Sequence, residues 1–412
     1  MTYVIMRAPM NRSPARDCAR LSVPALLLGS LLGPTFLATA FLAPPLLGGC
    51  AREPDAIRIG VSCPLTGDQA KIGGDMLHGA ELAVAEVNEA GGLLGKPVRV
   101  FALDDQHNAT QAVAAAHRFV ASKSVLGVIA HLNSACSLPA SDIYARGGLV
   151  QVTPCSTNIG LTRRGLKTLF RMCAHDGTQG SAAAVFAVRT LKARRVFVLD
   201  DKSTYGQGLA DEFAKAVAKL GSNVLGRDSL NQGEKDFSAL LTRIRSLRPQ
   251  LLFFGGMYPE ASLLAKQSRD LGLKATLMGG DGLYDKTLIQ LAGTPAAEGV
   301  CATMVGLDMS RIRAARAFVA AYERRYGQVG PYSPYAYDAM RVVLEAIRRA
   351  GVPDRARVVA EVRNTRRFKG VTGETTFDDN GDTLNQVISI YAVRNGTWVY
   401  RGQSSGLPAA KP

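Results

Sequence analysis

Short apolar runs alternate with amphipathic, helix-like stretches along most of the chain from residue 57 onward. Residues 125–158 show the repeating unit, in which the apolar runs Val125–Ala130 and Leu149–Val152 flank the helix-like segment Leu138–Arg146. The order of strand, helix and strand predicts a parallel sheet with helices packed against it. The unit recurs in two successive halves of similar size, with no block of helices or strands alone between them. We therefore expect an α/β protein with two sheet-containing parts.

The C-terminal part departs from this order. Arg311–Tyr326 and Tyr335–Ala350 carry apolar residues at helical spacing, which predicts two long helices. Two β-rich runs follow, Gln386–Val393 and Thr397–Arg401, and they flank Asn395-Gly396, a dipeptide typical of two-residue hairpin turns. We expect the chain to end in antiparallel strands.

Small polar residues follow both apolar runs of the repeating unit, as Asn133-Ser134-Ala135 and Cys155-Ser156-Thr157. In parallel sheets ligands bind beyond the carboxyl ends of the strands, where the free N–H groups of helix N-termini attract a carboxylate or a phosphate. The hydroxyls of Ser134 and Thr157 would add donors from two neighbouring strands. The alternative is that these residues only cap helices, as serine and threonine commonly do.

Polar residues also follow strand-like runs in the second half, among them Tyr205 and Asp281. A cradle for an anion in one half and a carboxylate in the other would suit a zwitterion that bridges a cleft between them. Nothing in this set resembles a nucleophile held beside a general base. The pattern therefore favours a binding protein over an enzyme.

Short motifs for other chemistry are incomplete. Gly402–Gly406 matches the GxSxG elbow of hydrolases, but no histidine follows Ser404. Gly206-Gln207-Gly208 lacks the third glycine of a dinucleotide loop, and no Walker A pattern occurs. Asp378–Asp382 has the alternating oxygens of a calcium loop without its final glutamate, which indicates a turn. We expect no enzymatic activity, no cofactor and no metal site.

The composition is that of a soluble globular protein. Charged residues make up 20% of the chain and hydrophobic residues 47%. The formal net charge is +15, but lysine and arginine are scattered and form no basic run interleaved with aromatic residues. We therefore expect a solvated surface and no nucleic acid among the partners.

The N-terminus has the features of an export signal. A basic region up to Arg20 precedes the apolar run Leu21–Leu47, which ends in Leu47-Gly48-Gly49-Cys50. Leu-Gly-Gly-Cys resembles a bacterial lipobox, so we expect a signal peptide at 1–49, a lipidated Cys50 and a linker at 50–56. The protein would then be held at a membrane in the periplasm or at the cell surface. The alternative is a transmembrane anchor, against which four prolines within the apolar run argue.

Several runs of the chain match one bacterial family in the family's order and spacing, and they cover nearly everything from Ile57 to Tyr400. On these runs the chain resembles the leucine/isoleucine/valine-binding proteins of bacterial ABC importers. The matching runs are His131-Leu132, Pro139–Tyr144, Thr153-Pro154, Tyr205-Gly206 with Gly208–Ala210, Gly233–Ser238, Gly255-Gly256 with Pro259-Glu260, and Thr376-Phe377-Asp378 with Gly381-Asp382.

The resemblance implies the type I periplasmic-binding fold, an α/β fold of two doubly wound parallel-sheet lobes joined by three crossovers. The crossovers are expected near Cys173–Asp176, Cys301–Leu307 and Thr383–Gln386. The N-terminal lobe would comprise residues 57–175 and 304–384. The C-terminal lobe would comprise residues 176–303 and 385–402, followed by a tail at 403–412.

The resemblance also implies a function. The protein would be an extracytoplasmic, monomeric binding protein that closes around leucine or another branched-chain or related amino acid. It would deliver this ligand to the permease subunits of an ABC importer. The alternative within the same fold is a sensor-type binding protein for a small amide or urea-like ligand. The expected export signal favours transport, because cytoplasmic sensors lack one.

Ligand contacts follow from the resemblance by position. Ser134 would bind the ligand carboxylate together with Thr157 and the main chain at Cys155. Asp281 stands where the family places an acidic residue for the ammonium group, and Tyr205 lies on the facing lobe. These residues concern the amino-acid head group.

Four positions depart from the family's pattern. Ile72 and Met257 stand where aromatic residues commonly flank the ligand side chain. His107 and Asn133 occupy positions that form a disulfide in close relatives, so that bridge is absent as a pair. The departures bear on the identity of the ligand side chain more than on its head group.

Five cysteines follow Cys50, and an odd number leaves at least one thiol unpaired. We favour a Cys136–Cys155 bridge, which would brace the carboxylate cradle in place of the lost family bridge. A bridge between Cys173 and Cys301, both on expected crossovers, is the alternative pairing. The remaining hypothesis is that all five, including Cys63, are small buried residues.

Overall fold

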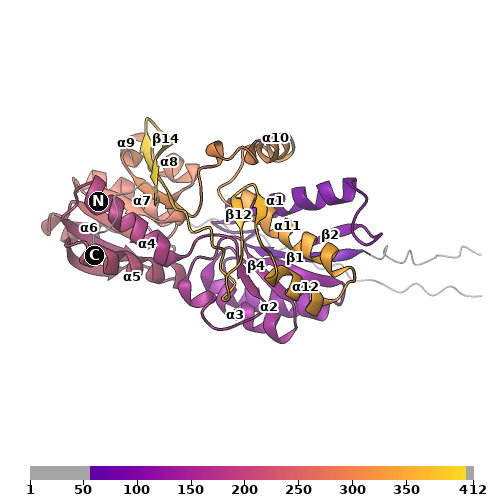
Figure 1. Cartoon of the computed structure of the whole chain (residues 1–412). Coiled ribbons are helices and arrows are strands. Elements are labelled where there is room, and N and C mark those ends of the chain that lie inside the picture. Colours follow the sequence, from indigo (N-terminus) through magenta and orange to yellow (C-terminus); the bar gives the residue numbers. More distant parts are fainter. Residues whose placement is uncertain (1–55, 405–412) are drawn as a thin grey trace, which may run out of the picture. The chain divides into compact units, whose positions relative to one another are not determined.

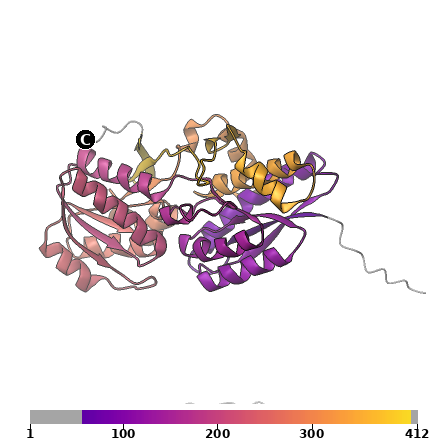
Figure 2. The same ribbon diagram turned by 60° about the horizontal axis from the view of Figure 1, so that its bottom comes forward.

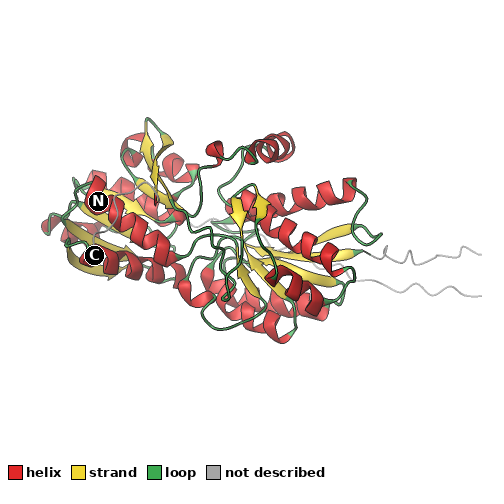
Figure 3. Cartoon of the chain, in the orientation of Figure 1, coloured by secondary structure: helices red, strands yellow, loops and turns green. Residues whose placement is uncertain are grey.

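The structure is a computed structural model that describes residues 56–404 of the chain. All helices and strands within this range belong to one compact unit. Its strands form one sheet of five, one of seven and one of two. Figure 1 labels the elements, and Figure 3 shows the strands of the two large sheets with helices packed against them.

The first sheet has five parallel strands in the order β2-β1-β3-β4-β5. These are β1 (Ile57–Cys63), β2 (Val98–Asp104), β3 (Val125–Ala130), β4 (Val150–Thr153) and β5 (Leu169–Arg171). The helices of this lobe are α1 (Ala70–Glu89), α2 (Ala109–Ala121), α3 (Ser134–Arg146), α11 (Ser333–Ala350) and α12 (Arg355–Arg363). Apolar residues of α1 and α11 form the core on one face, and those of α2 and α3 form the core on the other. β3 is consequently buried along its whole length, as expected for a strand covered on both faces.

The second sheet has seven strands in the order β14-β13-β10-β9-β8-β6-β7. These are β6 (Arg195–Asp200), β7 (Asn223–Ser229), β8 (Leu251–Gly255), β9 (Thr276–Gly279), β10 (Cys301–Met304), β13 (Ser389–Arg394) and β14 (Thr397–Gln403). The helices of this lobe are α4 (Asp176–Val185), α5 (Thr204–Lys219), α6 (Ser238–Ser246), α7 (Tyr258–Asp270), α8 (Lys286–Ala292) and α9 (Thr294–Ala297). Phe213 of α5 stacks on Phe253 of β8 with ring centroids 3.7 Å apart, in the core on one face. Figure 1 labels α4 to α9 around this sheet, and Figure 2 shows the helices of this lobe, in magenta to salmon, from another side.

The chain passes between the two sheets three times: after β5, between β10 and α11, and before β13. The expected two-lobed α/β fold with three crossovers is therefore confirmed. The segment between β10 and α11 carries α10 (Ala315–Tyr326). The returning segment carries a small two-stranded sheet of β11 (Phe368–Gly370) and β12 (Gly373–Thr375).

The expected C-terminal hairpin is also confirmed. β13 and β14 pair in antiparallel fashion, and the turn residues Asn395 and Gly396 both have positive φ, 51° and 74°. The pairing extends beyond Arg401, where we expected the strand to end. Ser404 donates its N–H to the Ile388 carbonyl at 2.7 Å, and the Ser404 hydroxyl accepts from the Ile388 N–H at 3.1 Å. These hydrogen bonds hold the start of the predicted tail against the strand.

The two long helices begin at other residues than predicted. α10 begins at Ala315 rather than Arg311, because Met309–Arg311 forms a separate 3-10 turn capped by Asp308. α11 begins at Ser333, two residues before Tyr335, with Pro334 in the first turn, where its missing N–H has no intrahelical partner to lose.

The favoured Cys136–Cys155 disulfide is wrong. All five cysteines from Cys63 to Cys301 are buried free thiols. Cys136 packs among residues of α2 and α3 on one face of the first sheet, whereas Cys155 packs on the other face with its Sγ 3.9 Å from Met76 Sδ. Residues that follow adjacent strands can thus be separated by the sheet itself. Cys173 and Cys301 likewise belong to different core clusters and do not pair.

Arg171, a wholly buried residue at the end of β5, ties the start of the first crossover to the third. Its Nε donates to Asp382 Oδ1 at 2.8 Å. Its Nη1 donates to the main-chain oxygens of Ser156 and Asn158 at 3.2 and 2.7 Å, and its Nη2 donates to the Thr162 hydroxyl at 2.8 Å. The buried charge therefore has a counter-ion and further acceptors. One side chain joins β5, the loop after β4 and the third crossover.

Asp176, the first residue of α4, is wholly buried just beyond the first crossover. Within residues 56–404 neither of its carboxyl oxygens has a hydrogen-bond partner. Burial raises the pKa of Asp176 to about 8, although the nearby hydroxyl of Thr157 acts in the opposite direction. The carboxyl is therefore mostly protonated at neutral pH, whereas in the unfolded chain it is ionised.

We predict that Arg171→Met destabilises the protein by about 3–5 kcal/mol, because it leaves Asp382 as a buried charge without its counter-ion. Urea unfolding of both proteins measures the loss. Arg163→Met is the matched control, since Arg163 is exposed, and it should change stability by no more than about 0.5 kcal/mol. Equal effects of the two substitutions would show that the buried ion pair contributes nothing.

We also predict that Asp176 makes stability fall as pH rises. Its folded form keeps a proton that the unfolded form has released, so its contribution is complete below about pH 4 and is lost as the pH rises through about 8. The slope approaches about 1.4 kcal/mol per pH unit within that window. Urea unfolding at several pH values should show a steeper decline for the wild type than for Asp176→Asn. Parallel curves would contradict this assignment.

Candidate functional site

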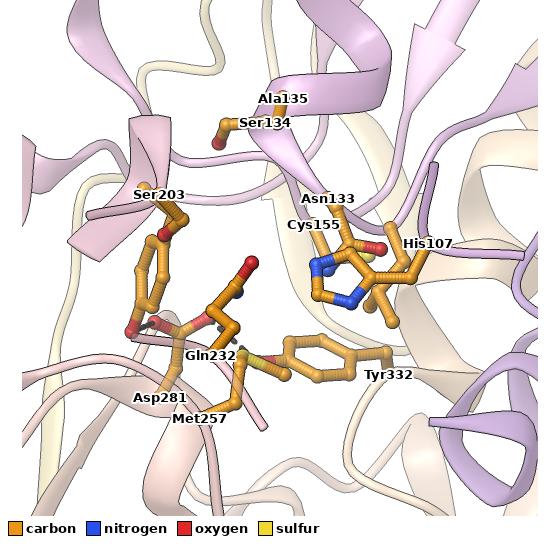
Figure 4. A pocket seen from close by; sticks show the side chains of 12 residues that line it. His107, Asn133, Ser134, Ala135, Cys155, Ser203, Gln232, Met257, Asp281 and Tyr332 are labelled. Atoms are coloured by element: carbon orange, nitrogen blue, oxygen red, sulfur yellow. Dashed lines mark hydrogen bonds between the residues drawn. The ribbon is translucent and has the colours of Figure 1, made fainter. Parts of the chain in front are cut away.

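A pocket lies at the carboxyl ends of the parallel strands of both sheets (Figure 4). Its empty space measures about 420 Å³, part of it open to solvent. The residues that follow β2, β3 and β4 line it on one side: His107, Leu132, Asn133, Ser134, Ala135 and Cys155. The residues that follow β6 to β9 line it on the other side: Ser203, Tyr205, Gln232, Met257 and Asp281. Tyr332, directly before α11, completes the wall.

Asp281 is the one acidic residue among those that line the pocket. Its Oδ1 accepts hydrogen bonds from the Tyr205 hydroxyl and from Gln179 Nε2, each at 2.9 Å. Its Oδ2 accepts from the Tyr332 hydroxyl at 2.7 Å. Burial raises the pKa of Asp281, and these three donors act in the opposite direction. The arrangement fixes the carboxyl in place as an acceptor for a cationic group.

Glycines bring Tyr205 and Asp281 together. A Cβ atom on Gly280, directly before Asp281, would lie 2.4 Å from the Tyr205 hydroxyl. A Cβ atom on Gly206 would lie 2.4 Å from the Gly255 carbonyl oxygen, where the first turn of α5 meets the end of β8. Only glycine permits these approaches, so the glycines in the sequence mark where the pocket wall is tightest.

Ser134 is the first residue of α3, and its hydroxyl accepts a hydrogen bond from the Asn158 N–H at 3.3 Å. The Ser156 hydroxyl joins the same two loops, because it lies 3.0 and 3.1 Å from the carbonyl oxygens of His131 and Leu132. A helix N-terminus presents N–H groups without intrahelical partners. Ser134 and Ala135 place this end of α3 in the pocket wall, where it suits an anion.

Two of the predicted ligand contacts do not line the pocket. Ile72, in α1, is buried in the core of the first lobe. Thr157 is also buried, and within the described part of the chain its hydroxyl has no hydrogen-bond partner. The structure brings the other five predicted residues to the pocket wall: Ser134, Cys155, Tyr205, Met257 and Asp281.

Sequence reasoning did not assign a ligand contact to His107, Asn133 or Tyr332. His107 and Asn133 follow β2 and β3, so the strand-end pattern that identified Ser134 was able to find them as well. We considered them only as the former disulfide positions. Tyr332 precedes a helix instead of following a strand, and no local signal in the sequence marks it.

The remaining motifs have structural roles. Asp378 accepts from the N–H groups of Asn380 and Asp382, which forms the expected turn. Among residues 56–404, no cluster of three or more histidine, cysteine, aspartate or glutamate residues is arranged to hold a metal ion. In the same range no helix has both the length and the apolar character needed to cross a membrane.

Comparison with known proteins identifies relatives of nearly the whole described region. Residues 56–397 match the family described as periplasmic binding protein. The Leu/Ile/Val-binding protein homolog 1 of Brucella abortus (strain 2308) is 36% identical over 326 residues, which are 79% of this chain and 87% of that protein.

Solved structures give the same result. The leucine binding protein LivK of Thermotoga maritima superposes with a TM-score of 0.79 at 34% identity, over 84% of this chain and 98% of that one. The branched-chain amino acid transporter substrate binding protein LivJ of Streptococcus pneumoniae, solved in complex with isoleucine, gives a TM-score of 0.78 at 26% identity, over 84% of this chain and 100% of that one.

These proteins bind substrates and do not transform them, which confirms the expectation that the chain is not an enzyme. The two-lobed fold, the pocket at the strand ends and the similarity over most of the chain agree with one another. The chain belongs to the periplasmic binding protein family, among the relatives of the Leu/Ile/Val-binding proteins.

Proposed function

We propose that the protein captures an amino acid between its two lobes and delivers it to the permease subunits of an ABC importer. The observation that carries this proposal is the pocket that contains the buried Asp281 carboxyl together with the N-terminus of α3. Such a pair suits the ammonium and carboxylate groups of one zwitterion. The Brucella relative is named for leucine, isoleucine and valine, and the Streptococcus structure holds isoleucine.

The head group would bind as follows. The ammonium group would donate to Asp281, and the tyrosine hydroxyls that now donate to this carboxyl can also accept from a cation. The ligand carboxylate would receive the Ser134 hydroxyl and main-chain N–H groups near Cys155. The Thr157 hydroxyl, which is buried behind the pocket wall and has no partner within residues 56–404, would join them once the wall shifts around the ligand. Met257 would contact the ligand side chain, with Ile72 in the layer behind the wall.

Closure of the lobes would remove the ligand from water, as in other two-lobed binding proteins. For the lobes we propose the boundaries 57–175 with 304–384, and 176–303 with 385–402. Proteins of this family act outside the cytoplasm. We propose further that a lipid on Cys50 holds the monomeric protein at the membrane; Cys50 and the signal 1–49 lie outside the described residues.

We predict that Asp281→Ala weakens amino-acid binding by orders of magnitude, because the ammonium group would be buried without its counter-charge. Ser134→Ala should cost about 1.5–3 kcal/mol, the range for a hydrogen bond to a charged group. Calorimetry of the protein without residues 1–49 against the twenty amino acids measures both. Asp270→Ala, at an exposed position of α7, is the control and should bind as the wild type does.

Two outcomes would count against this proposal. Failure of the wild type to bind any amino acid would refute amino-acid capture. Near-normal affinity of Asp281→Ala for an amino acid would place the ammonium group elsewhere.

We predict that Cys50→Ala abolishes metabolic labelling of the protein with a radioactive fatty acid and releases it from the membrane fraction. Cys18→Ala, within the same export signal, is the control and should be labelled normally. Labelling that persists in Cys50→Ala would refute the lipid anchor.

A further inference from the structure

Three polar side chains form a hydrogen-bonded relay at one wall of the pocket. Asn133 Nδ2 donates to Gln69 Oε1 at 2.8 Å, and Gln69 Nε2 lies 3.0 Å from His107 Nδ1. Gln69 sits just before α1, and the other two residues follow β2 and β3. The relay thus connects the loop after β2 with the loop after β3.

The direction of the relay determines which atoms stay free. The Gln69 Nε2 atom is a donor, so His107 Nδ1 accepts and the ring hydrogen is on Nε2. Burial lowers the pKa of His107, which keeps the ring neutral. The relay therefore ends in one donor, the Nε2–H of His107, and one acceptor, Oδ1 of Asn133. If the side-chain amides of Gln69 and Asn133 were both rotated by half a turn, Asn133 would present the free donor and His107 the free acceptor. The relay would still end in one donor and one acceptor.

The acceptor is an unsatisfied group. Asn133 is 9% exposed, and its Oδ1 is buried with no hydrogen-bond partner within the part of the chain that the structure describes. Such a group costs about 1–3 kcal/mol unless a partner reaches it, and most buried polar atoms in proteins have one. A ligand that supplies the missing partner would recover this cost.

Both ends of the relay belong to the ligand pocket. Figure 4 shows the His107 ring beside Asn133 and Tyr332, with Gln232, Met257 and Asp281 on the facing wall. Gln232 donates through Nε2 to Asp201 Oδ2 at 3.1 Å, which leaves its own oxygen as a further acceptor from the second lobe. An aliphatic side chain would leave all of these groups unpaired.

We infer that the ligand is an amino acid whose side chain ends in a carboxamide or ureido group, held by His107 and Asn133. Such a group offers an oxygen to the His107 N–H and an N–H to the Asn133 oxygen at the same time. A carboxylate offers acceptors alone and would be repelled by Asn133 Oδ1. This inference rests on the proposed function, because it takes the head group to be that of an amino acid.

The test compares side chains of nearly equal shape. Asparagine, aspartate and leucine share a branched Cγ and differ in hydrogen bonding; glutamine and glutamate repeat the comparison with one more methylene, and citrulline supplies the ureido group. Calorimetry of the wild type should give at least one of asparagine, glutamine or citrulline an affinity about tenfold or more above that of leucine and of the matching acid.

Two variants assign the preference to the relay. His107→Phe and Asn133→Leu should each lower the ratio of amide to leucine affinity by about tenfold, while leucine affinity holds or rises. His117→Phe is the matched control, since His117 is exposed on α2, and it should leave the ratio unchanged. Melting temperatures of the variants show whether they fold. If they do not fold, the affinities of the wild type for the amides and for leucine still test the inference.

The outcomes separate this inference from the proposed function. Leucine or isoleucine bound more tightly than asparagine, glutamine and citrulline would overturn the inference and leave amino-acid capture intact. An amide preference that survives in both folded variants would overturn the assignment to His107 and Asn133. Absence of binding to every amino acid would refute the proposed function itself.

Discussion

The buried charge of Arg171 constrains the rest of the structure. An arginine without contact with water needs acceptors in fixed places, and Arg171 finds them in Asp382 and in the carbonyl groups on either side of Thr157. The loop that carries Cys155 and Thr157 is therefore held against the third crossover. The pocket wall and the connection between the lobes depend on the same side chain.

The carboxyl in the pocket is likewise held from both lobes. Asp281 belongs to the second lobe and accepts from Tyr205 and Gln179 of that lobe, but also from Tyr332 at the start of a helix that packs on the first. A carboxyl whose donors come from two bodies responds to their separation. Its hydrogen bonds are complete only while Tyr332 stays in reach, so the position of the lobes and the polarity of the pocket are linked.

Much of the fold was predictable because its signals are local. The wholly apolar β3 and the Asn395-Gly396 turn each determine their conformation within a few residues. The strand-end rule found Ser134 and Asp281 for the same reason: parallel strands bring their carboxyl ends to one edge. The resemblance to a known family then supplied the lobes, which no local pattern specifies.

The wrong disulfide and the unpredicted site residues depend on tertiary contacts, which a sequence does not display. Cys136 and Cys155 follow adjacent strands, but which face of the sheet each thiol occupies is decided by the packing of α3 and α1. Tyr332 lines the pocket from a position before a helix, and Gln69, also before a helix, supports the wall through its hydrogen bonds to Asn133 and His107. Their roles follow from tertiary contacts alone.

The free thiols bear on how this protein reaches its native state. Burial raises the pKa of each of the five cysteines, so the thiolate, which is the form that reacts with oxidants, is scarce in the folded protein. The loops after β2 and β3 are joined instead by the hydrogen bonds of His107, Gln69 and Asn133, which form without an oxidant or an isomerase. Within residues 56–404 the native structure thus contains no disulfide that an oxidant would have to form.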